Sequence, residues 1–127
     1  MRLLLDTHIL VWCLSGDRKL PLATAELIRN PATDVYFSAV SIWEVAIKSA
    51  LGKMRADASA MLKNLVDEGF EELPVTAQHT VATMTLPLHH RDPFDRLLVA
   101  QSRLESLRLL TDDRIMALYG EPVVLVG

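Results

Sequence analysis

The sequence lacks disulfide-forming cysteines and long hydrophobic runs, and each absence excludes a class of protein. A single cysteine, Cys13, permits no internal disulfide, as expected of a chain that folds in a reducing compartment. No run approaches the roughly 20 apolar residues that a membrane span needs. Asp6 and His8 interrupt the apolar stretch near the N-terminus, which a signal peptide tolerates poorly. We therefore expect a soluble, cytoplasmic protein that does not act at a membrane.

The chain also lacks an excess of positive charge. Its 13 Lys and Arg residues are outnumbered by 16 Asp and Glu, and the net charge is −3. This balance argues against a protein that holds nucleic acid by bulk electrostatics, but it allows an enzyme that grips a short stretch of RNA with a few local cations. Half of the 127 residues are hydrophobic and no segment has low complexity, which excludes disorder. We expect a single domain over residues 1–127.

Strand and helix patterns alternate along the whole chain. Short apolar or β-branched runs predict strands at residues 2–5, 35–39, 72–75, 108–111 and 123–126. Helical spacing and capping residues predict helices near residues 8–15, 21–30, 41–52, 58–68, 77–86, 92–106 and 114–120. This alternation is typical of a mainly parallel sheet with helices on both faces. The predicted fold class is therefore α/β, a three-layer α/β/α fold with five strands.

Four acidic residues are expected where strands are followed by helices. They are Asp6, Glu44, Asp95 and Asp113. In an open α/β sheet the carboxyl ends of the strands face one crevice, so side chains there converge from distant parts of the sequence. Four carboxylates in one crevice repel one another and cannot all stay ionised without a cation. The pattern therefore predicts a hard divalent metal, and a metal held by carboxylates indicates phosphate chemistry.

Each acid also has a purely structural explanation as a helix cap. Asp6 is suited to cap the helix that follows it, and Ser41 with Glu44 matches the S-x-x-E capping box. Asp92 can cap the helix that contains Asp95. Capping explains an acid at each helix start but does not require four of them at one edge of a sheet. Taken together, the four acids favour the metal site.

The segments around these acids resemble a known family. The sequences DTH after the first strand, SIWE, HRDPFDRLLVAQ and LTDD are similar to those of the PIN domain. More narrowly, they resemble the VapC-type ribonuclease toxins of bacterial toxin–antitoxin pairs. The resemblance covers essentially the whole chain, and DPFDRLLVAQ is its most specific part.

The resemblance implies which residues form the site. The catalytic and metal-binding acids would be Asp6, Glu44, Asp95 and Asp113, and the cofactor would be Mg²⁺ or Mn²⁺. The Thr-x-Asp spacing selects Asp113 over its neighbour Asp112. Thr7 and Thr111 would orient the carboxylates by hydrogen bonding, and Asp92 would support the site or cap the helix.

Three basic residues are expected to contact RNA. They are Lys48, Arg91 and Arg96, although an ion pair with Glu44 also explains Lys48. The adjacent histidines, His89 and His90, are expected to form loop hydrogen bonds and not a zinc site, because no cysteine or spaced histidine pair completes a ligand set.

The resemblance also implies the activity. We expect a metal-dependent endoribonuclease that hydrolyses RNA phosphodiester bonds and leaves a 5′-phosphate and a 3′-hydroxyl. It would act as a toxin, form a homodimer and bind a cognate antitoxin, with apolar helices near Trp12, Trp43 and Leu51 supplying contacts. A catalytically inactive PIN-like domain that binds RNA or a protein stays open as the alternative.

Overall fold

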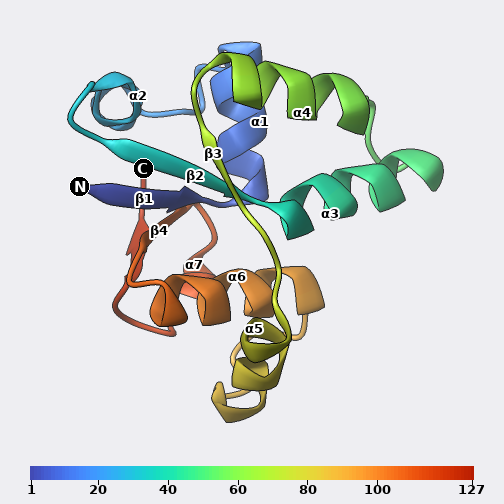
Figure 1. Cartoon of the computed structure of the whole chain (residues 1–127), viewed down its shortest axis with the longest axis vertical. Coiled ribbons are helices and arrows are strands. Elements are labelled where there is room, and N and C mark those ends of the chain that lie inside the picture. Colours follow the sequence, from blue (N-terminus) through green and yellow to red (C-terminus); the bar gives the residue numbers. More distant parts are fainter.

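The computed structural model describes residues 1–127 as a five-stranded sheet between two layers of helices (Figure 1). The strands are β1 (Arg2–Leu5), β2 (Asp34–Ser38), β3 (Glu71–Leu73), β4 (Arg108–Thr111) and β5 (Val123–Leu125). The helices are α1 (Thr7–Ser15), α2 (Leu22–Arg29), α3 (Ala39–Ala50), α4 (Ala58–Asp67), α5 (Ala77–Ala82), α6 (Pro93–Leu104) and α7 (Arg114–Ala117), with a 3-10 turn η1 (Thr83–Thr85). All strand pairs are parallel, so the predicted fold class is confirmed.

The apolar run of β1 explains why the sheet is covered on both faces. Successive side chains of a strand point to opposite faces, and a parallel sheet is buried on both. Leu3 and Leu5 pack into a core beneath α1, α2 and α4, whereas Leu4 packs into a second core with Leu98 and Leu109 beneath α5, α6 and α7. All three leucines of β1 are fully buried. The two cores make β1 the rigid centre of the molecule.

The strand order places a crevice beside β1. The order is β3-β2-β1-β4-β5, so the chain builds one side of the sheet from β1 to β3 and then crosses to β4 on the other side. Ligands bind in open α/β sheets where the strand order reverses, outside the carboxyl ends of the strands. Here that point lies between the ends of β1 and β4, which pair in register from Leu3 with Arg108 to Leu5 with Leu110.

Several helix boundaries follow the predicted caps, and one does not. Asp92 caps α6 by accepting the N–H groups of Phe94 and Asp95, and Thr76 caps α5. Helix α3 begins directly after β2, and its cap is Ser38. The capping box expected at Ser41 is therefore wrong. None of the helices is long and apolar enough to cross a membrane.

Candidate active site

A polar cleft of about 220 Å³ opens at the carboxyl edge of the sheet, and no hydrophobic side chain lines it. Its lining residues are Asp6, Thr7, His8, Glu44, Lys48, His90, Asp92, Asp95 and Asp113. They come from the starts of α1 and α6, the interior of α3, the loop before α6 and the turn after β4. The structure thus brings together the four acids that the sequence pattern singled out, together with Thr7, Lys48 and Asp92.

Asp6 is held rigidly at the end of β1. Its backbone N–H donates to the carbonyl of Leu110 (3.0 Å), which continues the pairing of β1 with β4. One carboxylate oxygen accepts the N–H of Thr7 (2.6 Å), and the other accepts the hydroxyl of Thr111 (2.7 Å). Only 4% of Asp6 is exposed, and this burial raises the pKa of its carboxyl although the bond from Thr111 opposes the shift. Thr111 makes the hydrogen bond expected of it.

Glu44 reaches the cleft from inside α3 and not from a helix start. Because Ser38 caps the helix by accepting the N–H of Val40 (3.1 Å), Glu44 lies in the second turn, and its side chain contacts Thr7 at the start of α1. Its Oε1 accepts a hydrogen bond from the hydroxyl of Thr7 (2.7 Å), and its Oε2 accepts one from the ammonium of Lys48. The hydrogen bond to Glu44 raises the pKa of Lys48. The ion pair that explains Lys48 is therefore present, on the wall of the cleft.

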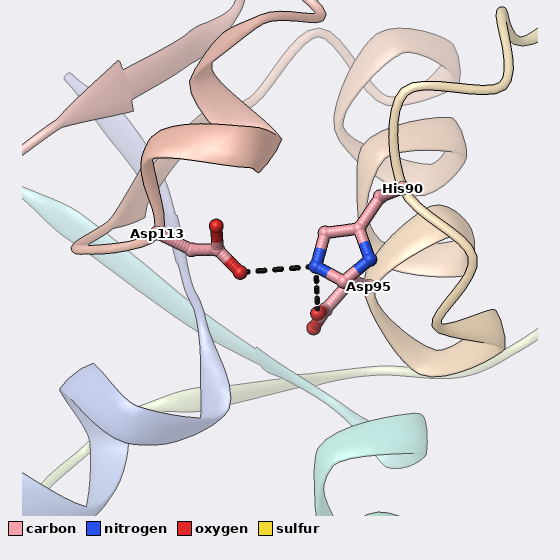
Figure 2. A group of neighbouring side chains, drawn as sticks. All are labelled: His90, Asp95 and Asp113. Atoms are coloured by element: carbon pink, nitrogen blue, oxygen red, sulfur yellow. Dashed lines mark hydrogen bonds and ion pairs between the residues drawn. The ribbon is translucent and has the colours of Figure 1, made fainter.

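Asp95 and Asp113 meet at the ring of His90 (Figure 2). The Nε2 atom of His90 lies 3.0 Å from Oδ2 of Asp95 and 3.0 Å from Oδ2 of Asp113. One ligand atom from each of the three residues lies within 4.8 Å of the other two, a spacing that suits a metal ion. The ring of His90 is 16% exposed. Sequence reasoning expected only a loop histidine here, so it missed a residue of the cleft.

The two carboxyl groups beside His90 have opposite pKa shifts. Burial, followed by repulsion from Asp6 and other acids of the cleft, raises the pKa of Asp95 to about 8. Burial also acts to raise the pKa of Asp113, but hydrogen bonds from His90 and from backbone N–H groups outweigh it and leave that pKa below its ordinary value. The contact of His90 Nε2 with Asp113 Oδ2 (3.0 Å) contributes to the lowered pKa of Asp113, whereas repulsion from the other acids adds to the raised pKa of Asp95.

Asp113 and Asp112 take different positions although they are adjacent. Asp113 caps α7, since its Oδ1 accepts the N–H of Ile115 (2.8 Å), and its Oδ2 faces the cleft. Asp112 does not line the cleft. Its Oδ1 is buried without a hydrogen bond, 3.7 Å from Nδ1 of His8. The choice of Asp113 as the cleft residue agrees with this geometry.

The two arginines near α6 lie outside the cleft. The guanidinium of Arg96 donates to the carbonyls of Thr83 (2.8 Å) and Pro87 (3.0 Å) and to the hydroxyl of Tyr119 (3.1 Å). We therefore correct the expectation for Arg96, because its side chain ties the segment before α6 to the core and is not free to hold a phosphate. Arg91 is exposed, and its contact with RNA stays a prediction.

The residues of the cleft fit a hard divalent cation. Five carboxyl groups line it, and Lys48, the only lysine among the lining residues, is already paired with Glu44. Carboxylate oxygens are the ligands that Mg²⁺ and Mn²⁺ prefer. Burial raises the pKa of Asp6 and of Asp95, and repulsion between the acids of the cleft adds to both shifts, so both carboxyl groups are costly to ionise. A cation held by these oxygens would offset that cost.

The fold and the cleft define a three-layer α/β/α protein with an acidic site where the strand order reverses. The model of the PIN domain family matches residues 3–122. Because this match covers nearly the whole chain, the protein belongs to the PIN domain family. No curated protein matches the chain significantly.

Solved structures share this fold at low sequence identity. VapBC2 from Rickettsia felis, bound to a DNA fragment from their promoter, has 17% identity and a TM-score of 0.72, over 99% of this chain and 98% of that chain. A toxin–antitoxin complex from Klebsiella pneumoniae has 19% identity and a TM-score of 0.68, over 96% and 95%. FitAcB from Neisseria gonorrhoeae has 18% identity and a TM-score of 0.64, over 99% and 97%. At these identities the likeness is one of fold.

Proposed function

We propose that the protein is a metal-dependent endoribonuclease that hydrolyses RNA phosphodiester bonds and acts as the toxin of a toxin–antitoxin pair. The observation that carries the proposal is the convergence of Asp6, Glu44, Asp95 and Asp113 on one cleft at the carboxyl edge of a PIN fold. The proposed products carry a 5′-phosphate and a 3′-hydroxyl. The proposed site of action is the cytoplasm, where RNA is present.

The four acids of the cleft and Thr7 have proposed parts in this chemistry. Bound Mg²⁺ or Mn²⁺ would activate water and stabilise charge on the leaving oxygen. Asp6, Asp95 and Asp113 would hold the cation, with Glu44 completing the acidic quartet. The hydroxyl of Thr7 donates a hydrogen bond to Glu44 (2.7 Å). Hydrogen bonds of this kind orient the side chains that bind a metal.

The cationic contacts for RNA are proposed from position and charge. Lys48 presents its ammonium at the wall of the cleft, where it would meet a phosphate while it neutralises Glu44. Arg91 is exposed and lies in sequence between His90 and Asp92 of the cleft, and it would hold the RNA backbone. Contacts of this kind set the position of the RNA and carry no sequence information.

The proposed toxin role is supported by the proteins whose solved structures share this fold. Two of the similar structures, from Rickettsia felis and Klebsiella pneumoniae, are a VapBC complex and a toxin–antitoxin complex. We propose that this chain likewise forms a homodimer and binds a small antitoxin. Exposed apolar side chains such as Trp43 (60%) and Leu51 (64%) offer surface for these contacts. Co-purification with the product of the neighbouring gene, followed by sizing, tests the assembly.

The first test does not depend on knowing the RNA. Thermal stability of the antitoxin-free protein should rise on titration with Mg²⁺ or Mn²⁺, because a ligand that binds only the folded state adds RT ln(1 + [L]/Kd), or about 2.7 kcal/mol at 100-fold excess over Kd. The rise should shrink in Asp6→Asn and in Asp95→Asn. Asp67→Asn, at an exposed acid on α4, is the matched control and should respond like the wild type.

The second test asks for turnover. Asp95→Asn should lose RNA cleavage by at least about 1,000-fold, since a metal contributes several kcal/mol and each 1.4 kcal/mol is a factor of ten in rate. Full activity in that variant would overturn the assignment. No stabilisation of the wild type at millimolar metal would leave an acidic cleft that binds no cation, and would favour the catalytically inactive domain that binds RNA or a protein.

A further inference from the structure

The ring of His90 is fixed from both sides. Its Nδ1 accepts the backbone N–H of Asp92 (3.1 Å), and its Nε2 faces Oδ2 of Asp95 and Oδ2 of Asp113 at 3.0 Å each. A neutral imidazole has one protonated nitrogen and one acceptor. Because Nδ1 accepts a hydrogen bond from a backbone N–H, the proton resides on Nε2. His90 therefore presents an N–H, and not a lone pair, to the two carboxylates.

The backbone of His90 is tied down as firmly as its ring. The N–H of His90 donates to the hydroxyl of Tyr119 (3.1 Å), and the same hydroxyl accepts the guanidinium of Arg96 (3.1 Å). Tyr119 is buried in the core beneath α6. Asp92, which donates to the ring, is itself the cap of α6. The orientation of the imidazole is therefore fixed by hydrogen bonds within the protein and does not depend on a bound ligand.

The two carboxylates have few other partners on the side of His90. Oδ1 of Asp113 is committed to the cap of α7, so Oδ2 is its only oxygen that faces the cleft. Asp95 is largely buried beside the same N–H, and its side chain is 14% exposed. When both are ionised, as binding of a cation requires, neighbouring carboxylates repel, and a donor between them offsets that repulsion.

We propose that His90 is a positioning residue of the metal site: its Nε2–H bridges Asp95 and Asp113 and holds their oxygens at the separation that a divalent cation needs, without itself binding the cation. This inference rests on the proposed function and deepens it. To bind a metal through Nε2, the ring would have to carry its proton on Nδ1. That N–H would then point at the backbone N–H of Asp92, and two donors repel each other. The local geometry therefore opposes His90 as a ligand.

Calorimetric titration with Mg²⁺ and with Mn²⁺ tests the proposal, with no need for an RNA substrate. His90→Ala should weaken both cations alike by about 10- to 100-fold, the usual loss when a group that orients metal ligands is removed. His90→Gln, whose amide can still donate to the carboxylates, should recover part of that affinity. His89→Ala is the matched control, because His89 packs edge-on against Tyr119 and does not line the cleft.

Each other result overturns the inference in a recognisable way. Tighter binding in His90→Ala would mean that the ring competes with the cation. A loss confined to Mn²⁺, which accepts nitrogen ligands more readily than Mg²⁺, would mean that His90 is a ligand after all. Wild-type protein that binds neither cation would overturn the proposed function itself, whereas normal wild-type binding with an unaffected His90→Ala would overturn only the role of His90. Unfolding of each variant in chelator checks that the fold is intact.

Discussion

The two ends of the sheet carry two different cavities. At the carboxyl edge lies the acidic cleft, which no hydrophobic side chain lines. At the amino edge lies a cavity of about 360 Å³ in which seven of the thirteen lining residues are hydrophobic, among them Ile28, Val35 and Phe70. The half-buried Cys13 lines it too, and burial raises the pKa of its thiol to about 11. One end concentrates charge, and the other is lined by a mixture of apolar and polar residues.

The direction of the helices explains this division. Helices α1, α6 and α7 begin at the carboxyl edge, where their free N–H groups bind Asp6, Asp92 and Asp113. The N-terminal end of a helix favours negative charge, whereas its C-terminal end does not. At the amino edge α2 and α4 end, at Arg29 and Asp67. Helix N-termini therefore stabilise acidic side chains at the carboxyl edge of the sheet. Bringing several acids together there costs stability, because they are buried and repel one another.

Asp95→Asn should show the largest difference in stability between the two edges. In chelator at pH 8, it should raise the free energy of unfolding by roughly 2–4 kcal/mol, because it removes a buried, repelled carboxylate. This is about half of what a pKa raised from about 4 to about 8 implies at about 1.4 kcal/mol per unit, since the side chain keeps some contact with solvent. Urea unfolding measures the change. Asp67→Asn at the amino edge, where the acid is exposed, should shift stability by no more than about 0.5 kcal/mol. Equal effects of the two substitutions would contradict the contrast.

The acidic cleft should also give the molecule a specific pH dependence. The pKa of Asp95 is about 8 in the folded protein and about 4 in an unfolded chain, so the folded state binds this proton more tightly. Its contribution to stability is fully present below pH 4 and is lost as the pH rises to 8. In metal-free buffer, the gap in melting temperature between Asp95→Asn and wild type should widen from pH 5 to pH 8 and then level off. A gap that is constant with pH would refute the raised pKa.

Thr111→Val should destabilise the carboxyl edge by about 1–3 kcal/mol, since it leaves a buried oxygen of Asp6 without its partner. Thr111→Ser keeps the hydroxyl and should retain most of the stability, which separates the hydrogen bond from the loss of a methyl contact. Denaturant unfolding in chelator measures both. Similar losses in the two variants would assign the effect to packing.

The smallest effect is expected at the amino edge. Cys13→Ala should cost about 1 kcal/mol or less, since the side chain is only half-buried, and should leave the response to Mg²⁺ unchanged. Because the pKa of the thiol is about 11, Cys13 in the folded protein should react with a thiol reagent at pH 8 far more slowly than in the unfolded chain. Rapid labelling of the native protein would show that the Cys13 thiol is accessible and reactive in the folded state, contrary to this prediction.

Local patterns in the sequence predict the strands and most helix starts, but one pattern was ambiguous. Ser38 and Ser41 are both suited to cap a helix, and S-x-x-E favoured the second. The structure uses Ser38, because α3 follows β2 without a loop. Glu44 then lies in the second turn, where its contact with Thr7 across the cleft fixes it. The acid was predicted correctly as part of the cleft for a reason that was partly wrong.

Two other residues show where sequence reasoning stops. His90 and Asp113 are 23 residues apart, and only the packing of the loop before α6 against the turn after β4 brings them together. Arg96 looks from its sequence like a contact for phosphate, yet the carbonyls of Thr83 and Pro87 take up its donors. The spacing H-x-D-P around Asp92 was a usable signal, since a ring two residues before a cap is within reach of the N–H of that cap.

The strand order has a consequence for how the protein is made. Asp6 and Glu44 belong to the half of the sheet built first, whereas Asp95 and Asp113 arrive with the half that is added on the far side of β1. Translation therefore passes β4 before the fourth acid, Asp113, is added to the chain. A truncated product that ends before β4 lacks both Asp113 and Thr111, the partner of Asp6. The complete cleft therefore needs residues from both halves of the sheet, and a fragment that ends before β4 lacks part of it.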